Sequence, residues 1–332
     1  MVITRTPFRV SFFGGGTDRY EWFSENGGGV ISTTIDKYCY LTLRKLPPFF
    51  EHKHRIVYSR VENVTNIDEI QHPVVREVFR LFGIQEGKEL HHDGDLPARS
   101  GLGSSSSFTV GLLMAIQALK GHFSSKSWLA DMAIRVEREI LNETVGYQDQ
   151  IAAAYGGLNH IEFKKNGDYE VNPILINEDA RNNLQSHLML FFTGVGRFSS
   201  DVSKAQVKSM GQKKDDYANL TQLLNEAKTL FGRNEFNVSE FGSLLHEGWL
   251  IKRSLSEGIT SNAIDGMYEK AMKAGAFGGK IIGAGGGGFL LVCAPPNKHK
   301  QIQDALYPNI YVPIKFENSG ASVIHFDSSM SF

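Results

Sequence analysis

The sequence has little of the material that would place it in several large classes of protein. Only two of its 332 residues are cysteine, Cys39 and Cys293, and each lies inside an apolar stretch typical of a strand. The material for a disulfide framework or a zinc cluster is therefore lacking, and we expect a reducing, cytoplasmic location. No apolar run approaches the roughly 18 residues of a membrane span, and the first residues contain no signal-peptide core, so we expect a soluble protein.

Neither sign of charge predominates in the chain. The 35 lysine and arginine residues nearly balance the 36 aspartate and glutamate residues. The sequence therefore lacks the basic excess of a protein that follows a nucleic-acid backbone. We expect small molecules, rather than nucleic acid or a membrane, as its partners. The length exceeds that of one ordinary hydrophobic core and favours two closely packed domains of an enzyme.

Strand and helix signals are mixed along the chain without strict alternation. Runs of β-branched and aromatic residues predict strands at "VITRTPFRVSFF", "YCYLTL", "RIVYS", "GGLNHIEF", "LMLFF" and after "GAGGGG". Helical spacing of apolar residues predicts helices at "HPVVREVFRLFG", "SSSSFTVGLLMAIQALKG", "SSKSWLADMAIRVEREIL" and between about 199 and 273. This mixture favours an α+β fold. The polar stretch "KKNGDYEVNP" predicts a domain boundary that divides 1–172 from 173–332.

Three glycine-rich stretches stand out, because glycine is entropically costly unless the backbone must approach something closely. The first is "FFGGGTD", the second is "SGLGSSSS" from Ser100 to Ser107, and the third is "GAGGGG" from Gly283 to Gly288. One such stretch alone is more often a turn than a binding site. Three in one chain favour phosphate binding, since the unpaired amides and the dipole at a helix N-terminus attract anions.

Two known loop patterns do not fit the second stretch. A P-loop requires G-x-x-x-x-G-K-[ST], and no lysine follows Gly103. The nucleophile elbow of a serine hydrolase requires G-x-S-x-G, whereas the four serines run into Phe108. The remaining interpretation is a serine-rich turn that begins a helix, with amides for phosphates and hydroxyls for a magnesium ion, as in a kinase.

Acidic residues that phosphoryl transfer needs occur in "VEREILNETVGYQDQIAAAYGG". Such transfer uses carboxylates that hold a metal ion and, commonly, one that accepts a proton. Glu137 and Glu139 lie near the end of a predicted helix, where the simpler interpretation is a solvated helix face. Asp149 begins the short apolar stretch "DQIAAAYGG", where the simpler interpretation is a helix N-cap.

Taken in order, "PFRVSFFGGGTD", "LPARSGLGSSSSFTVGLL" and "KIIGAGGGGFLL" resemble the signature motifs of the GHMP kinases, the superfamily of galactokinase, homoserine kinase, mevalonate kinase and phosphomevalonate kinase. The family's phosphate-binding motif, P-x-x-x-G-L-G-S-S-[SA], matches Pro97 to Ser106. Arg99, inside this motif, would either meet a phosphate or face solvent. The resemblance covers nearly the whole chain. It implies a first domain like domain 2 of ribosomal protein S5 and a second, ferredoxin-like domain, with the active site between them.

Within the superfamily the chain resembles most the D-glycero-D-manno-heptose 7-phosphate kinases, through "GGGTD" at Gly14 to Asp18 and "VGYQDQ" at Val145 to Gln150. This resemblance implies phosphoryl transfer from ATP, with Mg²⁺, to the anomeric hydroxyl of heptose 7-phosphate, which gives the 1,7-bisphosphate. Asp149 would accept the hydroxyl proton or orient the hydroxyl. Arg9 would lie beside the transferred phosphate and keep Asp149 ionised, although a strand residue facing solvent is the simpler interpretation of Arg9.

The resemblance also implies binding residues. Glu137 and Ser105 would hold the metal ion, with Ser104 and Glu139 as alternatives, since the spacing from the helix glutamate to the aspartate is one residue longer than in mevalonate kinase. The phosphates of ATP would contact Pro97, Ser100, Gly101, Leu102, Gly103, Ser104, Ser105 and Ser106. The acceptor would contact Gly15, Gly16, Thr17, Asp18, Gly146, Arg197, Lys252, Gly285 and Gly286, with Arg197 and Lys252 on its own phosphate.

Other functions stay open on the sequence. Galactokinase-like sequences carry Glu and His where this chain has Gly15 and Gly16, so galactose is disfavoured, while Asp18 is kept as a ligand for a sugar hydroxyl. An L-fucose kinase or another sugar 1-kinase is the main alternative. A non-catalytic sensor of nucleotide and sugar is a third possibility, and the presence of both Glu137 and Asp149 argues against it. The oligomeric state is left undetermined.

Overall fold

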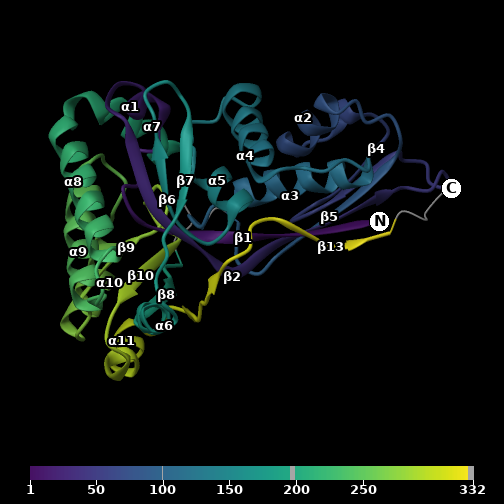
Figure 1. Ribbon diagram of the computed structural model, residues 1–332. Helices are drawn as coiled ribbons and strands as arrows, with labels where there is room; N and C mark the ends of the chain where they lie inside the picture. The colour runs from purple at the N-terminus through teal and green to yellow at the C-terminus, as the bar shows by residue number, and fades with distance from the viewer. Residues whose placement is uncertain (99, 195–198, 328–332) are drawn as a thin grey trace.

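Two β-sheets organise the chain, and the computed structural model describes residues 1–98, 100–194 and 199–327. Figure 1 shows the larger sheet along the length of the molecule and the smaller one beside the long green helices. The larger sheet has nine strands, β1 (Val2–Phe13), β2 (Gly28–Lys45), β3 (His54–Val57), β4 (Val61–Val64), β5 (Lys88–Gly94), β6 (Leu158–Phe163), β7 (Tyr169–Pro173), β12 (Phe316–Glu317) and β13 (Ser322–Phe326). The smaller sheet has four, β8 (Leu188–Phe192), β9 (Gly278–Ile281), β10 (Phe289–Cys293) and β11 (Tyr311–Val312).

Helices cover one face of the larger sheet and the outer side of the smaller one. They are α1 (Tyr20–Asn26), α2 (Pro73–Leu81), α3 (Ser104–Leu119), α4 (Lys126–Ile134), α5 (Gln148–Tyr155), α6 (Glu178–Ser186), α7 (Ser199–Ser209), α8 (Lys214–Phe231), α9 (Val238–Ser254), α10 (Asn262–Lys273) and α11 (His299–Leu306). Short 3₁₀ turns occupy Ile67–Glu69, Met210–Gln212 and Pro296–Lys298, and a π-helical turn occupies Arg135–Ile140. In Figure 1, α2 to α5 lie above the larger sheet, and α8 to α10 stand at the left end of the molecule.

The two longest strands, β1 and β2, form the centre of the larger sheet. They are antiparallel and pair from Val2 opposite Leu43 to Phe13 opposite Ile31. The first residues of β1 alternate between buried and half-buried, but every residue from Thr6 onwards is buried. Helices α3 and α5 contact β1, and so do α8 and α9 from the second half of the chain. The end of β1 is therefore enclosed by both halves of the chain, and this is where the site lies.

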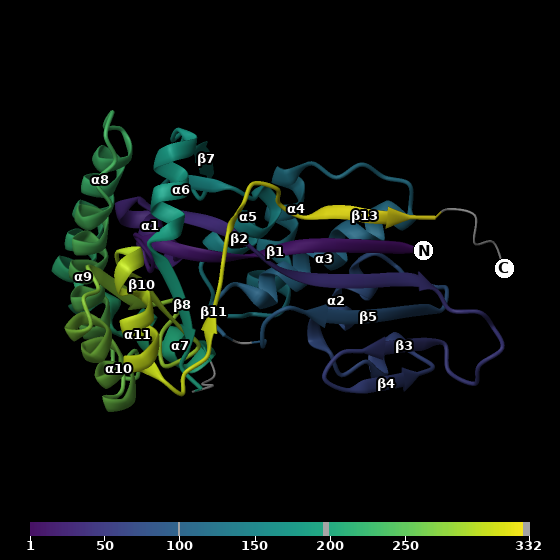
Figure 2. The same cartoon turned by 90° about the horizontal axis from the view of Figure 1, so that it is seen from below.

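The C-terminal part of the chain returns to the larger sheet. Strand β13 pairs antiparallel with β1, and β12 pairs antiparallel with β2. Figures 1 and 2 both show β13, in yellow, beside β1, in purple. The expected division into 1–172 and 173–332 assigns these two strands to a different unit from the sheet that they join. The sequence did not indicate this return.

The expected α+β class is confirmed, and most predicted elements occur at their predicted places. The first predicted strand is β1, and the serine-rich helix is α3. The helix predicted over "SSKSWLADMAIRVEREIL" is instead α4 followed by the π-helical turn. Part of the polar stretch "KKNGDYEVNP" forms β7, where only a boundary was expected. None of the helices in the part of the chain that the structure describes combines the length and apolarity needed to cross a membrane.

Candidate active site

An arginine and an aspartate form the centre of the site. Arg9 on β1 donates from Nε to Asp149 Oδ1 at 2.8 Å and from Nη2 to Asp149 Oδ2 at 3.0 Å. This two-pronged arrangement fixes the carboxylate in one orientation. Arg9 is 3% exposed, so it does not face solvent as a plain strand residue would. The N-cap of α5 is Tyr147, so the alternative of Asp149 as a simple N-cap is not what the structure shows.

Opposing influences act on the pKa of Asp149. Burial raises it above the ordinary value, and the nearby charge of Asp18 raises it further. The Arg9 guanidinium works in the opposite direction, through both its charge and its hydrogen bonds. The Asp149 side chain is still 28% exposed. It is thus a carboxylate that a small molecule can reach, held against a buried cation.

The phosphate loop begins helix α3 directly over this pair. Gly103 is the N-cap residue of α3 and has a left-handed backbone with φ of 76°. A Cβ atom placed on Gly103 would lie 3.3 Å from Arg9 Cγ and 3.5 Å from Asp149 Cγ. In addition, Arg9 Nη1 donates to the carbonyl of Gly101 at 2.6 Å. The first amides of α3, which have no acceptor within the helix, therefore lie close to the Asp149 carboxylate.

The predicted phosphate-binding residues differ in how they are placed. Leu102 is fully buried and its carbonyl accepts a hydrogen bond from Arg9 N, so its side chain belongs to the core and not to a phosphate contact. Pro97 and Ser105 are exposed, whereas Ser106 is buried. Ser100 is also buried, and its hydroxyl has no partner among the described residues.

Glu137 faces the phosphate loop. Thr109 Oγ1 donates to Glu137 Oε1 at 2.7 Å, Ser106 Oγ donates to Oε2 at 2.9 Å, and the Gln150 amide also donates to Oε2. Burial raises the pKa of Glu137 to about 7, although the hydrogen bond from Thr109 acts against the rise. The alternative residue Glu139 points away, because its side chain is 72% exposed and approaches Arg135. The solvated helix face therefore describes Glu139 and not Glu137.

The first glycine-rich loop is tightly built around Asp18. The Gly16 amide donates to Asp18 Oδ1 at 2.9 Å, and a Cβ atom on Gly146 would lie 1.9 Å from Asp18 Oδ2, so only glycine fits at position 146. The expected contact of Thr17 with a substrate needs correction. Thr17 is fully buried, and its hydroxyl hydrogen-bonds to the backbone of Gly14 and Gly29. It therefore stabilises the conformation of the loop from its buried side.

The third glycine-rich loop packs against the phosphate loop and against Ile259, which lies in the segment before α10. A Cβ atom on Gly288 would lie 2.1 Å from the carbonyl oxygen of Ser100. A Cβ atom on Gly285 would lie 2.8 Å from Ile259 Cγ2, and the Gly286 amide donates to the Ile259 carbonyl at 2.8 Å. Gly285 and Gly286, predicted as substrate contacts, therefore support the loop itself in this structure.

Further cations lie near the Arg9–Asp149 pair. Of those in the described residues, the sequence had predicted a role in the site for only one. Lys252 on α9 was predicted to contact the phosphate of the acceptor; in the structure it is instead buried, and its ammonium group donates to the carbonyls of Ile281 and Gly283. Lys280 on β9 was missed. Its only sequence signal is a lysine within the apolar stretch "GGKII". Arg19 was also missed, and its guanidinium donates to Ser203 Oγ at 3.0 Å. Arg197 and Arg99 lie outside the described residues.

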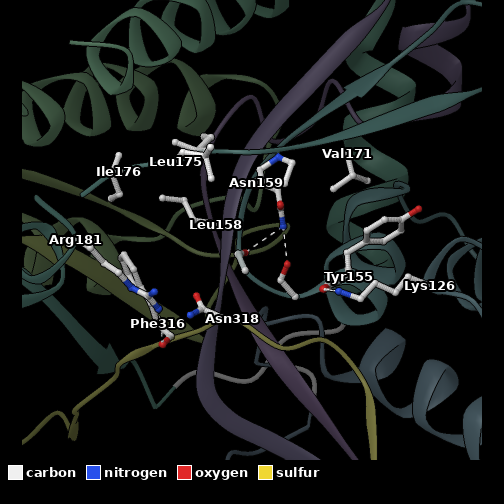
Figure 3. Close-up of a pocket in the computed structure, with 14 residues that line it drawn as sticks. Lys126, Tyr155, Leu158, Asn159, Val171, Leu175, Ile176, Arg181, Phe316 and Asn318 are labelled. Atoms are coloured by element: carbon white, nitrogen blue, oxygen red, sulfur yellow. Dashed lines mark hydrogen bonds between the residues drawn. The ribbon is translucent and has the colours of Figure 1, made fainter. Parts of the chain in front are cut away.

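A cavity of about 450 Å³ lies away from these residues. Figure 3 shows Lys126, Tyr155, Asn159 and Arg181 around it, with the Asn159 amide hydrogen-bonded to backbone carbonyls. Tyr155 ends α5, whereas Asp149 lies in the first turn of the same helix. The cavity is therefore at the opposite end of α5 from the Arg9–Asp149 pair, and none of the predicted site residues lines it.

Comparisons with known proteins agree with this arrangement. The family described as GHMP kinases N terminal domain matches residues 70–157, and GHMP kinases C terminal matches residues 228–312. D-glycero-alpha-D-manno-heptose 7-phosphate kinase from Campylobacter jejuni is 29% identical over 314 residues, which cover 91% of this chain and 92% of that one. A galactokinase from Pyrococcus furiosus is 25% identical over 340 residues, with 92% of each chain covered.

Solved structures show the same fold. The crystal structure of a D-glycero-D-manno-heptose 1-phosphate kinase from Bacteroides thetaiotaomicron superposes with a TM-score of 0.81 at 24% identity and covers 99% of this chain and 100% of that one. The two family matches together span slightly more than half of the 332 residues. The chain therefore belongs to the GHMP kinase family and is a phosphotransferase with a hydroxyl group as acceptor.

Proposed function

We propose that this protein is a sugar kinase that transfers the γ-phosphoryl group of ATP to the anomeric hydroxyl of D-glycero-D-manno-heptose 7-phosphate and forms the 1,7-bisphosphate. The observation that carries the proposal is the Arg9–Asp149 pair directly under the start of α3. The helix start favours a phosphate group, and the carboxylate beneath it is suited to a hydroxyl. An acceptor held between them is positioned for transfer.

Each member of the pair has a distinct task in this proposal. Asp149 takes the proton of the acceptor hydroxyl as the oxygen attacks the γ-phosphorus. Arg9 keeps Asp149 ionised against the effect of its burial, since the guanidinium lowers the pKa that burial raises. Arg9 also holds the carbonyl of Gly101, so the same side chain orients both the carboxylate and the phosphate loop.

The first glycine-rich loop supports a large acceptor. Gly15 has no side chain, so the backbone leaves room there next to Asp18, whereas the space beside Gly16 is occupied by the Tyr217 ring. A Cβ atom on Gly15 would approach only Ser11 Oγ, at 3.7 Å. The Ser11 hydroxyl below this position is buried and has no hydrogen-bond partner among the described residues. The similarity to the heptose 7-phosphate kinase of Campylobacter jejuni supports a heptose phosphate as this acceptor.

The residues near α3 fit a magnesium ion that is completed by ATP. Mg²⁺ prefers oxygen ligands and is usually bound by one or two carboxylates together with substrate phosphates. Glu137 supplies a buried carboxylate next to the first turn of α3, and Ser105 supplies an exposed hydroxyl there. When bound, Mg²⁺ neutralises charge on the phosphates. Among the described residues no three acidic, histidine or cysteine side chains gather as a metal site.

A substrate screen tests the proposed function. ADP release from ATP should be measured with heptose 7-phosphate, the unphosphorylated heptose, galactose and L-fucose, and phosphorus NMR should locate the new phosphate. We expect the highest kcat/KM with heptose 7-phosphate and a phosphate on C1. A preference for L-fucose or another free sugar would overturn the heptose assignment, and no turnover with any sugar would overturn the sugar kinase itself.

A further inference from the structure

Two lysines lie buried beside the Arg9–Asp149 pair and have no carboxylate partner in the part of the chain that the structure describes. Lys280 on β9 and Lys252 in the last turn of α9 are each 6% exposed. Within residues 1–98, 100–194 and 199–327, the lysines that form ion pairs are all elsewhere. A buried ammonium without a counter-charge is costly, so these two positions require an explanation.

Among the described residues, both ammonium groups hydrogen-bond only to main-chain carbonyls. Lys280 Nζ donates to the carbonyl of Phe12 at 2.7 Å, two residues before Gly14, the first glycine of the first glycine-rich loop. Lys252 Nζ donates to the carbonyls of Ile281, at 3.0 Å, and Gly283, where the third glycine-rich loop begins. Each lysine therefore fixes the base of one glycine-rich loop. Carbonyl oxygens satisfy the hydrogen bonds of an ammonium but do not neutralise its charge.

The surrounding charges leave an excess of positive charge. The charged groups that face the two ammonium groups are Arg9, Arg19 and Asp18. Arg9 is already paired with Asp149, and Arg19 hydrogen-bonds to neutral side chains. Burial and the neighbouring cation Arg9 lower the pKa of Lys280 to about 7, and burial and Lys280 lower that of Lys252. The carboxylates present do not balance these cations.

We propose that a phosphoryl group bound beside the Arg9–Asp149 pair is the missing counter-charge of Lys280 and Lys252, so that the two lysines strengthen phosphoryl binding through their charge without contacting the group. The group is either the γ-phosphoryl of ATP or the acceptor's own phosphate. This inference rests on the proposed phosphoryl transfer but not on which sugar accepts it. Both lysines are positioning residues, because their ammonium groups reach carbonyls and are not exposed to the substrate.

The test removes the charge but keeps a hydrogen-bond donor. Lys280→Gln and Lys252→Gln are compared with wild type and with Lys273→Gln, whose lysine side chain is 80% exposed. Binding of inorganic phosphate is measured by calorimetry at pH 6.5. We expect affinity to fall about tenfold or more in the first two variants and to stay unchanged in the control. The unfolding temperature in phosphate-free buffer should stay the same or rise, because a buried unpaired charge has been removed.

A purely structural role for the lysines gives a different result. If the glutamine variants bind phosphate as wild type does, or lose affinity only together with a fall in the unfolding temperature, the proposal is wrong.

A second measurement uses wild type alone, in case a variant does not fold. Sulfate, a dianion that does not titrate in this range, is bound at pH 8 in two buffers of different ionisation enthalpy. Uptake of protons on binding supports the proposal, and no uptake contradicts it.

Titrations with different ligands show whether the phosphoryl group is the γ-phosphoryl of ATP or the acceptor's own phosphate. Wild type and Lys280→Gln are titrated with a non-hydrolysable ATP analogue and Mg²⁺, with heptose 7-phosphate, and with the unphosphorylated heptose. A loss for the ATP analogue assigns the γ-phosphoryl, and a loss for heptose 7-phosphate alone assigns the acceptor phosphate. Unchanged affinity for every ligand overturns the inference. Inorganic phosphate makes no assumption about the sugar, so a different preferred sugar would refute the heptose assignment while leaving this result intact.

Discussion

A Cβ atom added to Gly283 would lie 2.5 Å from the Cα atom of Gly101, so the third glycine-rich loop and the phosphate loop touch backbone to backbone. Both glycines have positive φ angles, 80° for Gly283 and 83° for Gly101. The contact joins a loop of the smaller sheet to the loop that begins α3. The position of the phosphate loop therefore depends on a residue far away in the sequence.

Substituting Gly283 by alanine should separate the two loops. We expect Gly283→Ala to raise the KM for ATP about tenfold or more and to lower the unfolding temperature. Gly121→Ala is the matched control, because Gly121 has a φ of 72° but nothing within 4 Å of its added Cβ. The control should show only the strain of a left-handed alanine, about 1 kcal/mol. Equal effects of both substitutions would mean that the close contact has no role.

Asp149→Asn should separate proton transfer from binding. The substitution keeps the shape of the side chain but removes its ability to accept a proton, so we expect kcat to fall by about 10² to 10⁴. The dissociation constant for the sugar phosphate should change little. Asp304→Asn, at an exposed pair with Lys300, serves as the control and should behave as wild type. A parallel loss of turnover and sugar binding would instead indicate that Asp149 mainly binds the sugar.

Glu137→Gln should change how activity depends on the metal ion. Replacing the buried carboxylate removes one charged oxygen donor, so the Mg²⁺ concentration for half-maximal activity should rise by about tenfold. Glu139→Gln, two positions along the chain and exposed, is the matched control and should titrate with Mg²⁺ as wild type does. If the shift appears in the Glu139 variant instead, the assignment of the metal ligand is wrong.

The pKa of Lys280 predicts how stability depends on pH. In the folded protein this pKa is lowered to about 7, from an ordinary value of 10.5. Between these values the unfolded chain binds more protons, so the free energy of unfolding rises with pH across that window. Relative to Lys280→Gln, wild type should therefore gain stability from pH 7 to pH 9.5. Chemical denaturation in phosphate-free buffer measures the difference, and a constant or falling difference would exclude a lowered pKa.

Local signals predicted much of the fold. Strand β1 and helix α3 follow from β-branched residues and from the serine start and glycine stop, which act over a few residues. Strands β12 and β13 were not predicted. Strand β12 has only two residues, and β13 has the β-branched and aromatic residues of a strand, Val323, Ile324 and Phe326, but in a short and mostly exposed run. Their pairing with β2 and β1 is a long-range contact that no local pattern records.

The site was predicted unevenly for a similar reason. The motifs identified Arg9 and Asp149, and the structure brings them together. Thr17 was misjudged because a polar residue in a loop motif gives no sign of facing inward. Lys280 was missed because a lysine in a strand is ordinarily solvated. Only the packing of α9 and the end of β1 against β9 makes it a buried charge.

The pairing of β13 with β1 has a consequence for how the chain is made. Among the described strands, β1 is synthesised before all the others and β13 after all the others, so the outer edge of β1 stays open until β13 has been made. An open edge with free N–H and C=O groups readily pairs with other chains. A nascent or truncated chain that ends before residue 316 would therefore expose the unpaired edge of β1, the strand that holds Arg9, to pairing with other chains. Pairing of β13 with β1 closes that edge.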